Sequence, residues 1–375
     1  MQFAFATATR ILFGEGKLAE AAPAARAMGR RALVVTGASP RHTIAVDAVP
    51  FAVVGEPSLA RIREGTALAR DAGCDVVIAM GGGSAIDAGK AIAALLTNPG
   101  DPLDYLEVIG RGHPLQRPAA PFIAIPTTAG TGSEVTMNAV LASAEHRVKA
   151  SLRSPVMLPR LAIVDPELTL DLPRAITAST GLDALTQLIE PYVSVRANAM
   201  TDLYCVEGIR RTAGALARAF DNGHDREARR DMAFASLLGG LSLANAGLGA
   251  VHGFAAPLGG MFPAPHGAAC AAVLPYAMQI NVRALRQRAP ESQALARYAE
   301  IGRLLTGSPQ ATAEDGVAWV RAICGKLEIP PLRAWGVSDA DIPVLVEKAA
   351  KASSMKANPL PLTPEELREM ISQAV

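Results

Sequence analysis

The 375-residue chain carries little charge and no cluster of basic residues. Only 19% of its residues are Asp, Glu, Lys or Arg, the formal net charge is +1, and lysines and arginines are scattered. A nucleic-acid-binding protein would carry a basic patch or stripe, so this composition argues against one. Half of the residues are hydrophobic, which favours a compact globular protein over a disordered or fibrous one.

The chain also has no closely spaced pair of cysteines. Its four cysteines lie far apart in the sequence and form no CxxC motif: Cys74, Cys205, Cys270 and Cys324. This spacing predicts reduced, mostly buried thiols in a cytoplasmic protein. The N-terminal segment lacks a basic region followed by a long apolar core, so we expect no signal peptide.

Charged residues are missing altogether between Asp231 and Arg283. A membrane-spanning helix needs about 20 unbroken apolar residues. Glycines and prolines, such as Gly247 and Pro257, interrupt this stretch repeatedly. We therefore interpret it as the buried centre of a helical domain rather than as a membrane segment.

Short β-branched runs alternate with helical patterns over the first 170 or so residues. The strand-like runs are 32–36, 51–55, 76–80, 122–126 and 161–165, and the clearest helical patterns are 58–73 and 84–97. This alternation predicts a parallel sheet covered by helices on both faces. After Pro173 strand-like runs nearly vanish, so we expect an α/β domain over 1–172, an all-helical domain over 173–375 and ligands in the cleft between them.

A glycine-rich turn follows the third strand-like run, in VVIAMGGGSAIDAGKAIA. Gly82 and Gly83 would let the backbone approach a pyrophosphate, and a helix that starts with Ser84 as N-cap would offer free N–H groups. The spacing matches neither GxGxxG nor a P-loop. A turn that serves packing alone is the alternative.

A second candidate loop, PTTAGTGSEVT, follows the fourth run. Its hydroxyl side chains, which could bond ribose or phosphate oxygens, belong to Thr127, Thr128, Thr131 and Ser133. Two such loops at the carboxyl ends of parallel strands fit the general rule for nucleotide sites. Capping within a Thr/Gly-rich loop is the alternative.

A polar pair and two histidines mark the second half of the chain. Asp183 and Gln187 lie four residues apart in GLDALTQLIE, which places them on one face of a helix. His252 and His266 lie in the charge-free stretch, and the prolines between them predict two adjacent elements rather than one helix. A single histidine in an apolar segment is usually a core residue, but Asp183 with two imidazoles favours a divalent metal such as Fe²⁺ or Zn²⁺.

Taken in order, these motifs resemble the iron-containing (group III) alcohol dehydrogenase family over nearly the whole chain. The motifs are GGGSAIDAGKA, PTTAGTGSEVT, the Lys149 segment, AIVDPELTLDLP, TGLDALTQLIEPYVS and HGFAAPLGG…PHG. The resemblance implies a Rossmann-like dinucleotide-binding domain, a helical metal and substrate domain, NAD or NADP, and commonly a homodimer. It also implies that Asp87 and Lys149 line the nucleotide site.

The family typically holds its metal with one Asp and three His. The resemblance places three of these ligands on Asp183, His252 and His266, which we also expect to act in catalysis, and the fourth on Gln187. A further active-site His of the family is Ala256 here. An amide oxygen is a weaker ligand than imidazole, so metal occupancy depends on Gln187.

The residue after the strand at 32–36 affects the choice of cofactor. The family often has an Asp there, which binds the ribose 2′-hydroxyl; here it is Gly37, followed by Ser39, Arg41 and His42. Without that carboxylate NADP becomes possible, because Arg41 could pair with its 2′-phosphate. A solvated turn is the alternative.

The sequence thus predicts an NAD(P)-dependent dehydrogenase or reductase for a small alcohol and its aldehyde or ketone, with a divalent metal, Fe²⁺ by resemblance or else Zn²⁺, polarising the substrate oxygen. One alternative is a metal-independent reductase that holds the oxygen with Gln187 and a histidine. Another is a nucleotide-binding protein that has lost catalysis. We expect a cytoplasmic homodimer without nucleic-acid or membrane partners.

Overall fold

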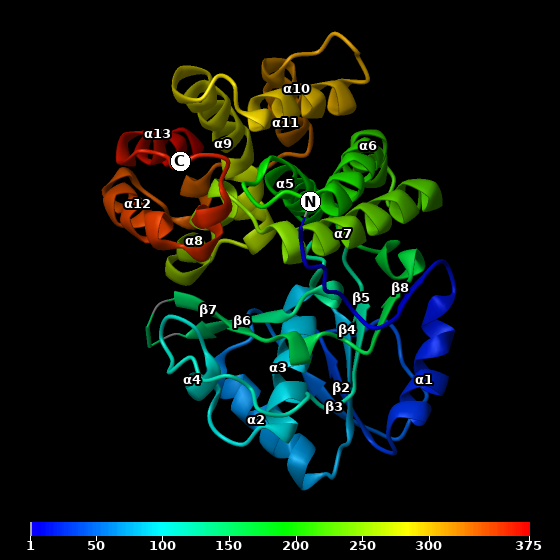
Figure 1. Cartoon of the computed structure of the whole chain (residues 1–375). Coiled ribbons are helices and arrows are strands. Elements are labelled where there is room, and N and C mark those ends of the chain that lie inside the picture. Colours follow the sequence, from blue (N-terminus) through cyan, green and yellow to red (C-terminus); the bar gives the residue numbers. More distant parts are fainter. Residues whose placement is uncertain (1, 144, 147) are drawn as a thin grey trace. The chain divides into compact units, whose positions relative to one another are not determined.

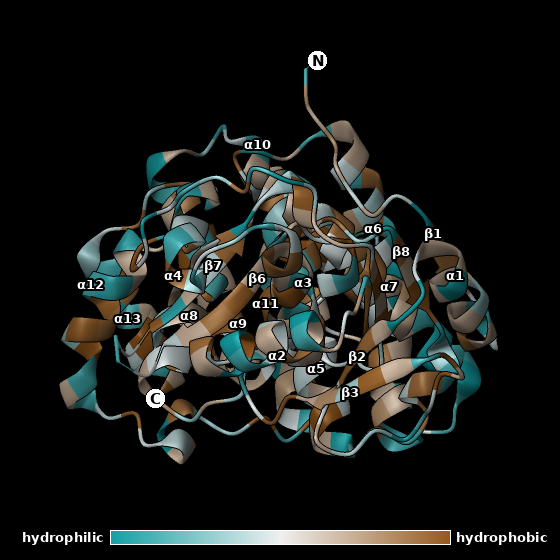
Figure 2. Ribbon diagram, turned by 90° about the horizontal axis from the view of Figure 1, so that it is seen from below, coloured by the Kyte–Doolittle hydropathy of each residue, from teal (hydrophilic) through white to brown (hydrophobic). Residues whose placement is uncertain are grey.

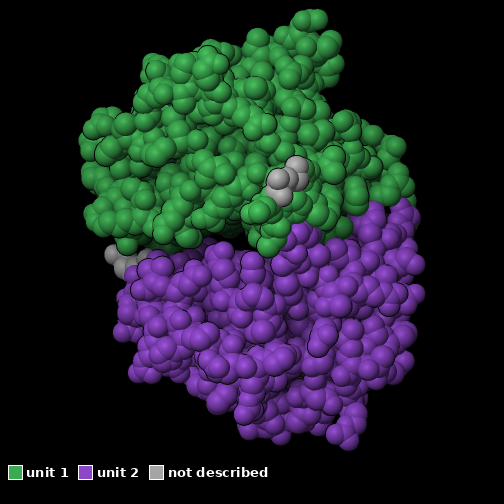
Figure 3. All heavy atoms as spheres, in the orientation of Figure 1, with its two compact units in different colours: residues 1–4, 129–131, 170–375 green, residues 5–128, 132–169 purple. Residues whose placement is uncertain are grey.

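The computed structural model describes residues 2–143, 145–146 and 148–375, and it divides into two compact units (Figure 3). The α/β unit comprises Phe5–Thr128 and Gly132–Thr169. The helical unit comprises Leu170–Val375, the short segment Ala129–Thr131 and the N-terminal residues up to Ala4.

The α/β unit is built on a six-stranded parallel sheet with the strand order β1-β8-β5-β4-β2-β3 (Figure 1). Its strands are β1 (Ile11–Phe13), β2 (Ala32–Thr36), β3 (Ala48–Ala52), β4 (Val76–Gly81), β5 (Phe122–Pro126) and β8 (Leu161–Val164). Four of the five predicted runs coincide closely with strands. The prediction for 51–55 was three residues late, because the chain has left the sheet by Val54, which is 75% exposed, and Gly55 has a left-handed φ of 69°.

Both faces of the sheet are buried, as the apolar runs predicted. In β4 the side chains of Val77 and Ala79 join one hydrophobic cluster, whereas those of Val76, Ile78 and Met80 join another. Successive side chains of a strand point to opposite faces, so this division means that helices or loops cover each face. Core packing therefore fixes the register of β4 and the position of the turn that follows it.

The described residues of the α/β unit also form four α-helices and an antiparallel pair of strands. The helices are α1 (Ala21–Met28), α2 (Leu59–Asp71), α3 (Gly83–Thr97) and α4 (Pro102–Tyr105). An antiparallel pair, β6 (Asn138–Ser143) and β7 (Val148–Arg153), lies outside the main sheet and was not predicted. At Gly89 an added Cβ would lie 2.7 Å from the Cβ of Ala79, so α3 packs closely on β4.

The second unit is helical, as predicted. Its helices are α5 (Arg174–Val193), α6 (Ala199–Asp221), α7 (Arg226–Ala246), α8 (Ala250–Met261), α9 (His266–Arg288), α10 (Gln293–Thr306), α11 (Ala313–Lys326), α12 (Ile342–Lys351) and α13 (Pro364–Ala374). Figure 2 shows apolar ribbon, in brown, inside the structure, while hydrophilic residues in teal recur along an outer helix such as α12.

The charge-free stretch forms the end of α7, all of α8 and the first part of α9. Among the described residues no single helix is long and apolar enough to cross a membrane. The pair α7 and α8 would pass by length and composition together, but the two helices meet at a bend of 99°. Most side chains of this stretch are buried, which agrees with the prediction of a helical core.

Candidate functional site

Helix α5 presents Asp183 and Gln187 one turn apart, as the sequence predicted. Both side chains are buried, with exposed fractions of 1% for Asp183 and 3% for Gln187. The amide Nε2 of Gln187 donates a hydrogen bond of 3.0 Å to Oδ2 of Asp183. One carboxylate oxygen of Asp183 is therefore engaged by its own helix, and the other, Oδ1, is left to face neighbouring helices.

Helices α8 and α9 bring the two histidines to this carboxylate. His252 lies in the first turn of α8, and His266 is the first residue of α9, so the predicted interruption between them is confirmed. An added Cβ at Gly267 would lie 2.6 Å from the backbone oxygen of Ser179 on α5. Only a glycine allows α9 to approach α5 this closely, and this approach places His266 beside Asp183.

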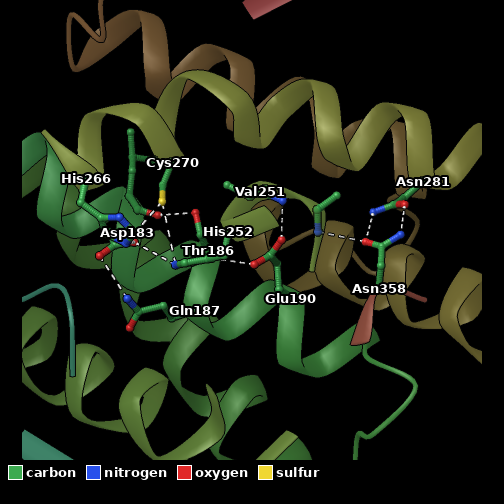
Figure 4. A network of polar contacts seen from close by, with 12 residues as sticks. Asp183, Thr186, Gln187, Glu190, Val251, His252, His266, Cys270, Asn281 and Asn358 are labelled. Atoms are coloured by element: carbon green, nitrogen blue, oxygen red, sulfur yellow. Dashed lines mark hydrogen bonds and ion pairs between the residues drawn. The ribbon is translucent and has the colours of Figure 1, made fainter. Parts of the chain in front are cut away.

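Four side chains converge at this point: those of Asp183, His252, His266 and Cys270 (Figure 4). Oδ1 of Asp183 lies 3.4 Å from Nε2 of His252 and 3.8 Å from Nε2 of His266. The Sγ of Cys270 lies 3.8 Å and 3.7 Å from the same two nitrogens. One candidate ligand atom from each residue lies within 4.8 Å of all the others.

A buried carboxylate fixes the proton of His252. Nδ1 of His252 lies 2.7 Å from Oε2 of Glu190, and Oε1 of Glu190 accepts a 2.7 Å hydrogen bond from the backbone N–H of Val251. An ionised carboxylate can only accept, so Nδ1 of His252 carries the proton. When the ring is neutral, the lone pair of the other nitrogen, Nε2, points towards the cluster.

The charges of the cluster shift its pKa values so that the ionised forms of Asp183, His252 and His266 are favoured. Burial opposes ionisation of Asp183, but His266 and His252 outweigh it and hold the pKa of that carboxyl below its usual range. Burial alone would lower the pKa of His252, yet Cys270 and Glu190 raise it well above its ordinary value. Chiefly through Cys270, and against burial, the pKa of His266 rises to about 9.

The cluster meets the chemical requirements of a divalent metal site. Oδ1 of Asp183 and Oε1 of Gln187 are buried side-chain oxygens for which the described part of the chain supplies no hydrogen-bond partner. An uncompensated buried carboxylate oxygen is costly. Since neutral His252 also presents a lone pair 3.4 Å from Oδ1, a positive centre, either a proton or a metal ion, is needed between them.

Sequence reasoning missed two residues of this site, Cys270 and Glu190. Cys270 lies four residues after His266 and therefore on the same face of α9. Glu190 lies seven residues after Asp183, two helical turns along α5. A second carboxylate on the helix that carries Asp183 was the available signal for Glu190. Nothing in the apolar sequence around Cys270 separated it from an ordinary buried thiol.

In the α/β unit, the glycine-rich turn joins β4 to α3 as predicted. The N-cap of α3 is Gly82, however, and Ser84 is already inside the helix, so the N-cap prediction for Ser84 was wrong. Gly82 takes an extended conformation and supplies no capping side chain, and Gly83 is the first helical residue. The N-terminal N–H groups of α3 thus emerge at the carboxyl end of a central strand.

Three other predicted cofactor residues follow the strands that flank β4. Gly37 comes directly after β2, and Thr127 and Thr128 come after β5. β2, β4 and β5 are parallel neighbours, so these residues share one edge of the sheet with Gly82. An added Cβ at Gly82 would lie 3.5 Å from the methyl group of Thr128.

Asp87 and Ser133 are joined to each other around the fully buried Lys90. The Ser133 hydroxyl donates to the Asp87 carboxylate, and Nζ of Lys90 donates to the backbone oxygen and hydroxyl of Ser133 at 2.8 Å and 3.1 Å. Nζ also donates to Thr136 and to the backbone of Asn138. Burial lowers the pKa of Lys90 to about 8. This network ties the loop after β5 to α3.

The remaining predicted cofactor residues lie elsewhere. Lys149 is on β7, where its Nζ forms an ion pair of 2.8 Å with Glu56. Thr131 belongs to the short segment that groups with the helical unit. The roles of Lys149 and Thr131 in cofactor binding stay predictions.

Sequence comparison places both halves of the chain in one family. The profile of the family described as "Iron-containing alcohol dehydrogenase" matches residues 8–166, and the profile described as "Fe-containing alcohol dehydrogenase family, C-terminal" matches residues 177–375. The chain belongs to the iron-containing alcohol dehydrogenase family. The predicted family is therefore confirmed, and with it the two-part fold and an NAD(P)-dependent oxidoreductase that uses a divalent metal.

Characterised members of the family are similar over most of their length. The chain is 38% identical over 321 residues to the 1,3-propanediol dehydrogenase of Klebsiella pneumoniae, covering 85% of this chain and 80% of that protein. It is 34% identical to the lactaldehyde reductase of Escherichia coli strain K12, covering 96% and 97%.

Solved structures of the family share the fold throughout. A crystal structure of 1,3-propanediol oxidoreductase has a TM-score of 0.92 and 32% sequence identity, with full coverage of both chains. The sulfoacetaldehyde reductase of Bifidobacterium kashiwanohense, solved in complex with NAD⁺, has a TM-score of 0.87 and 28% identity, covering 100% of this chain and 99% of that one.

Proposed function

We propose that the protein interconverts a short, neutral alcohol and its aldehyde or ketone, with a divalent metal held by Asp183, His252 and His266. The observation that carries this proposal is the convergence of these three side chains around Oδ1 of Asp183, a buried oxygen without a hydrogen-bond donor in the described chain. When bound, the metal supplies Lewis acidity for the substrate oxygen, and the nicotinamide exchanges hydride with the substrate carbon.

The protein's own residues orient and shield this centre. Glu190 keeps the proton of His252 on Nδ1, so that Nε2 stays available as a donor atom. Gln187 donates to Oδ2 of Asp183 and thereby fixes the rotation of the carboxylate. The side chain of His266 is 35% exposed, whereas those of Asp183 and His252 are 2% and 6% exposed. Substrate therefore reaches the centre from the side of His266.

We further propose that the cofactor phosphates bind at the N-terminus of α3. Gly82 and Gly83 bring the backbone N–H groups of this 15-residue helix to the sheet edge that Gly37, Thr127 and Thr128 share. A helix N-terminus favours negative charge, and glycines allow close approach of the phosphates. Whether NAD or NADP is preferred depends on the surroundings of Gly37.

The substrate follows from the relatives and from the low charge of the helical core. Two of the similar proteins are named for 1,3-propanediol and lactaldehyde, which are short and neutral, and a third is named for sulfoacetaldehyde, which is short and carries one negative charge. We therefore expect aldehydes of about two to four carbons to be reduced better than polyanionic ones, since buried charge without a partner is costly.

The geometry argues against a reductase that works without a metal. Such an enzyme would hold the substrate oxygen with the amide of Gln187 and a histidine, but Nε2 of Gln187 already donates to Asp183. Such an enzyme would also need protonated imidazoles, instead of a metal ion, to compensate Oδ1 of Asp183.

The variant Asp183→Asn tests the proposal. We expect metal content to fall from about one ion per chain towards zero and aldehyde-dependent NAD(P)H oxidation to be lost with it, because the only anionic oxygen facing both imidazoles is removed. Thr186→Ser is the control, since Thr186 lies on the same helix and only bonds the backbone of Leu182. Full turnover by Asp183→Asn would contradict the proposal.

A further inference from the structure

The cluster on α5, α8 and α9 contains a thiol that the proposed function has not used. Cys270 is fully buried, and its Sγ lies within 3.8 Å of both Nε2 atoms that face Asp183. Figure 4 shows the sulfur on the same side of α9 as the His266 ring and facing Asp183. The second, independent observation concerns Asp183, which is only 1% exposed. Its Oδ1 atom lacks a hydrogen-bond partner among the described residues and faces the same two histidine nitrogens.

The separations of these atoms fit a tetrahedral site. Ligand atoms that are about 2.0–2.3 Å from a tetrahedral zinc ion lie roughly 3.3–3.8 Å from one another. The two separations from Oδ1 of Asp183 to the histidine nitrogens are 3.4 and 3.8 Å, and the two from Sγ of Cys270 to the same nitrogens are 3.8 and 3.7 Å. Because all six separations are within 4.8 Å, shifts of up to about an ångström would bring the four donor atoms onto one ion.

Gln187, by contrast, is held as a support for Asp183. Its amide nitrogen is bonded to Oδ2 of Asp183, and in Figure 4 its oxygen lies on the far side of that nitrogen from the imidazoles. If the amide of Gln187 turned over to present its oxygen, that oxygen would face Oδ2 of Asp183. Both atoms are acceptors, so the hydrogen bond between Gln187 and Asp183 would be lost. Cys270 is therefore better placed than Gln187 to complete the metal site.

We propose that the fourth protein ligand of the metal is the thiolate of Cys270, and that the resulting Asp–His–His–Cys site prefers Zn²⁺ to Fe²⁺. The proposal rests on the proposed function in that it takes the metal to bind Asp183, His252 and His266. On binding, the S–H bond of Cys270 breaks, the proton leaves to solvent and a metal–sulfur bond forms, without a change of oxidation state. A soft thiolate favours zinc, and the two anionic ligands neutralise a divalent ion.

Cobalt substitution tests the ligand assignment without relying on turnover. The metal-free protein, loaded with one Co²⁺ per chain, should show a near-ultraviolet sulfur-to-cobalt charge-transfer band. The band should disappear in Cys270→Ser and persist in Gln187→Leu, where the amide is absent. Cys324→Ser is the matched control, because Cys324 is a half-buried thiol of the same unit that bonds the backbone of Ala271.

X-ray absorption of the zinc-loaded, unaltered protein gives a second readout that needs no variant. We expect a sulfur scatterer at about 2.3 Å from the zinc. In competition titrations, Cys270→Ser should lower the ratio of zinc to iron affinity by about tenfold or more.

The outcomes separate this proposal from the proposed function. Stoichiometric metal without a charge-transfer band or a sulfur scatterer would overturn the role of Cys270 and leave the metal enzyme in place. A chain that binds no metal at all would overturn both. A band that survives in Cys270→Ser would assign it to another thiol and refute the proposal.

Discussion

At the scale of single residues, the site depends on which side chains direct a donor atom towards the proposed metal position. The sequence could identify Asp183, His252 and His266, because family motifs and the breaks between helices indicated them. It could not identify Cys270 or Glu190 as part of the site. Their positions result from the packing of α5, α8 and α9, and a lone cysteine in an apolar helix is usually only a buried thiol.

The variant Glu190→Gln tests how the site orients its imidazole. The amide can still accept from the N–H of Val251, but its other end no longer supplies the charged acceptor for Nδ1 of His252. We expect metal affinity to fall by about 10–100-fold, the range typical of losing such a supporting carboxylate. Competition with a chelator of known affinity measures the change, and an unaltered affinity would show that Glu190 does not orient the ligand.

Metal binding should also release protons. At pH 7 His266 holds a proton, because its pKa is raised to about 9, and a metal can bind only the neutral ring. Apparent metal affinity is therefore expected to rise with pH from 7 up to about 9. Calorimetric titrations in two buffers of different ionisation enthalpy count the protons. Identical heats in both buffers would contradict the predicted protonation.

At the scale of elements, the sequence located most strands and helices because their hydrophobic patterns are strong. It placed β3 too late, since Val53 and Val54 continue the apolar pattern after the strand has ended. It also missed the β6–β7 hairpin, whose strands alternate in burial but contain small and polar residues. The N-cap prediction for Ser84 failed because α3 begins one residue before Ser84, at Gly83, with Gly82 as its N-cap.

A substitution at Gly37, directly after β2, tests the preference between NAD and NADP. At Gly37 an added Cβ would meet no atom within 4 Å, so Gly37→Asp fits without strain. We expect kcat/KM for NADPH to fall by about tenfold or more, because the carboxylate repels a 2′-phosphate and can bond a ribose 2′-hydroxyl. Gly37→Asn is the control that separates charge from size. Equal losses with NADH and NADPH in Gly37→Asp would place the 2′-position elsewhere.

At the scale of the whole molecule, three helices of one unit share the metal centre, so metal should stabilise that unit. The two tryptophans, Trp319 and Trp335, both lie in the helical unit, and their fluorescence reports on it selectively. Zinc at about 100 times its dissociation constant should add about 2.7 kcal/mol to the free energy of unfolding. Thermal unfolding with and without zinc measures this.

Asp183→Asn serves as the control for that experiment, and its unfolding temperature should not respond to zinc. If zinc left the unaltered protein's unfolding temperature unchanged as well, the buried cluster would not be a metal site. The homodimer and the cytoplasmic location, which also concern the whole molecule, stay predictions.

The most direct test of the central claim is turnover before and after metal removal in one preparation. The protein is stripped with a chelator, assayed for NADH and NADPH oxidation with a panel of two- to four-carbon aldehydes, and assayed again after one equivalent of Zn²⁺ or, under anaerobic conditions, Fe²⁺. We predict negligible activity in the stripped protein and its return with the metal. Equal activity in the stripped and reloaded protein would contradict the account.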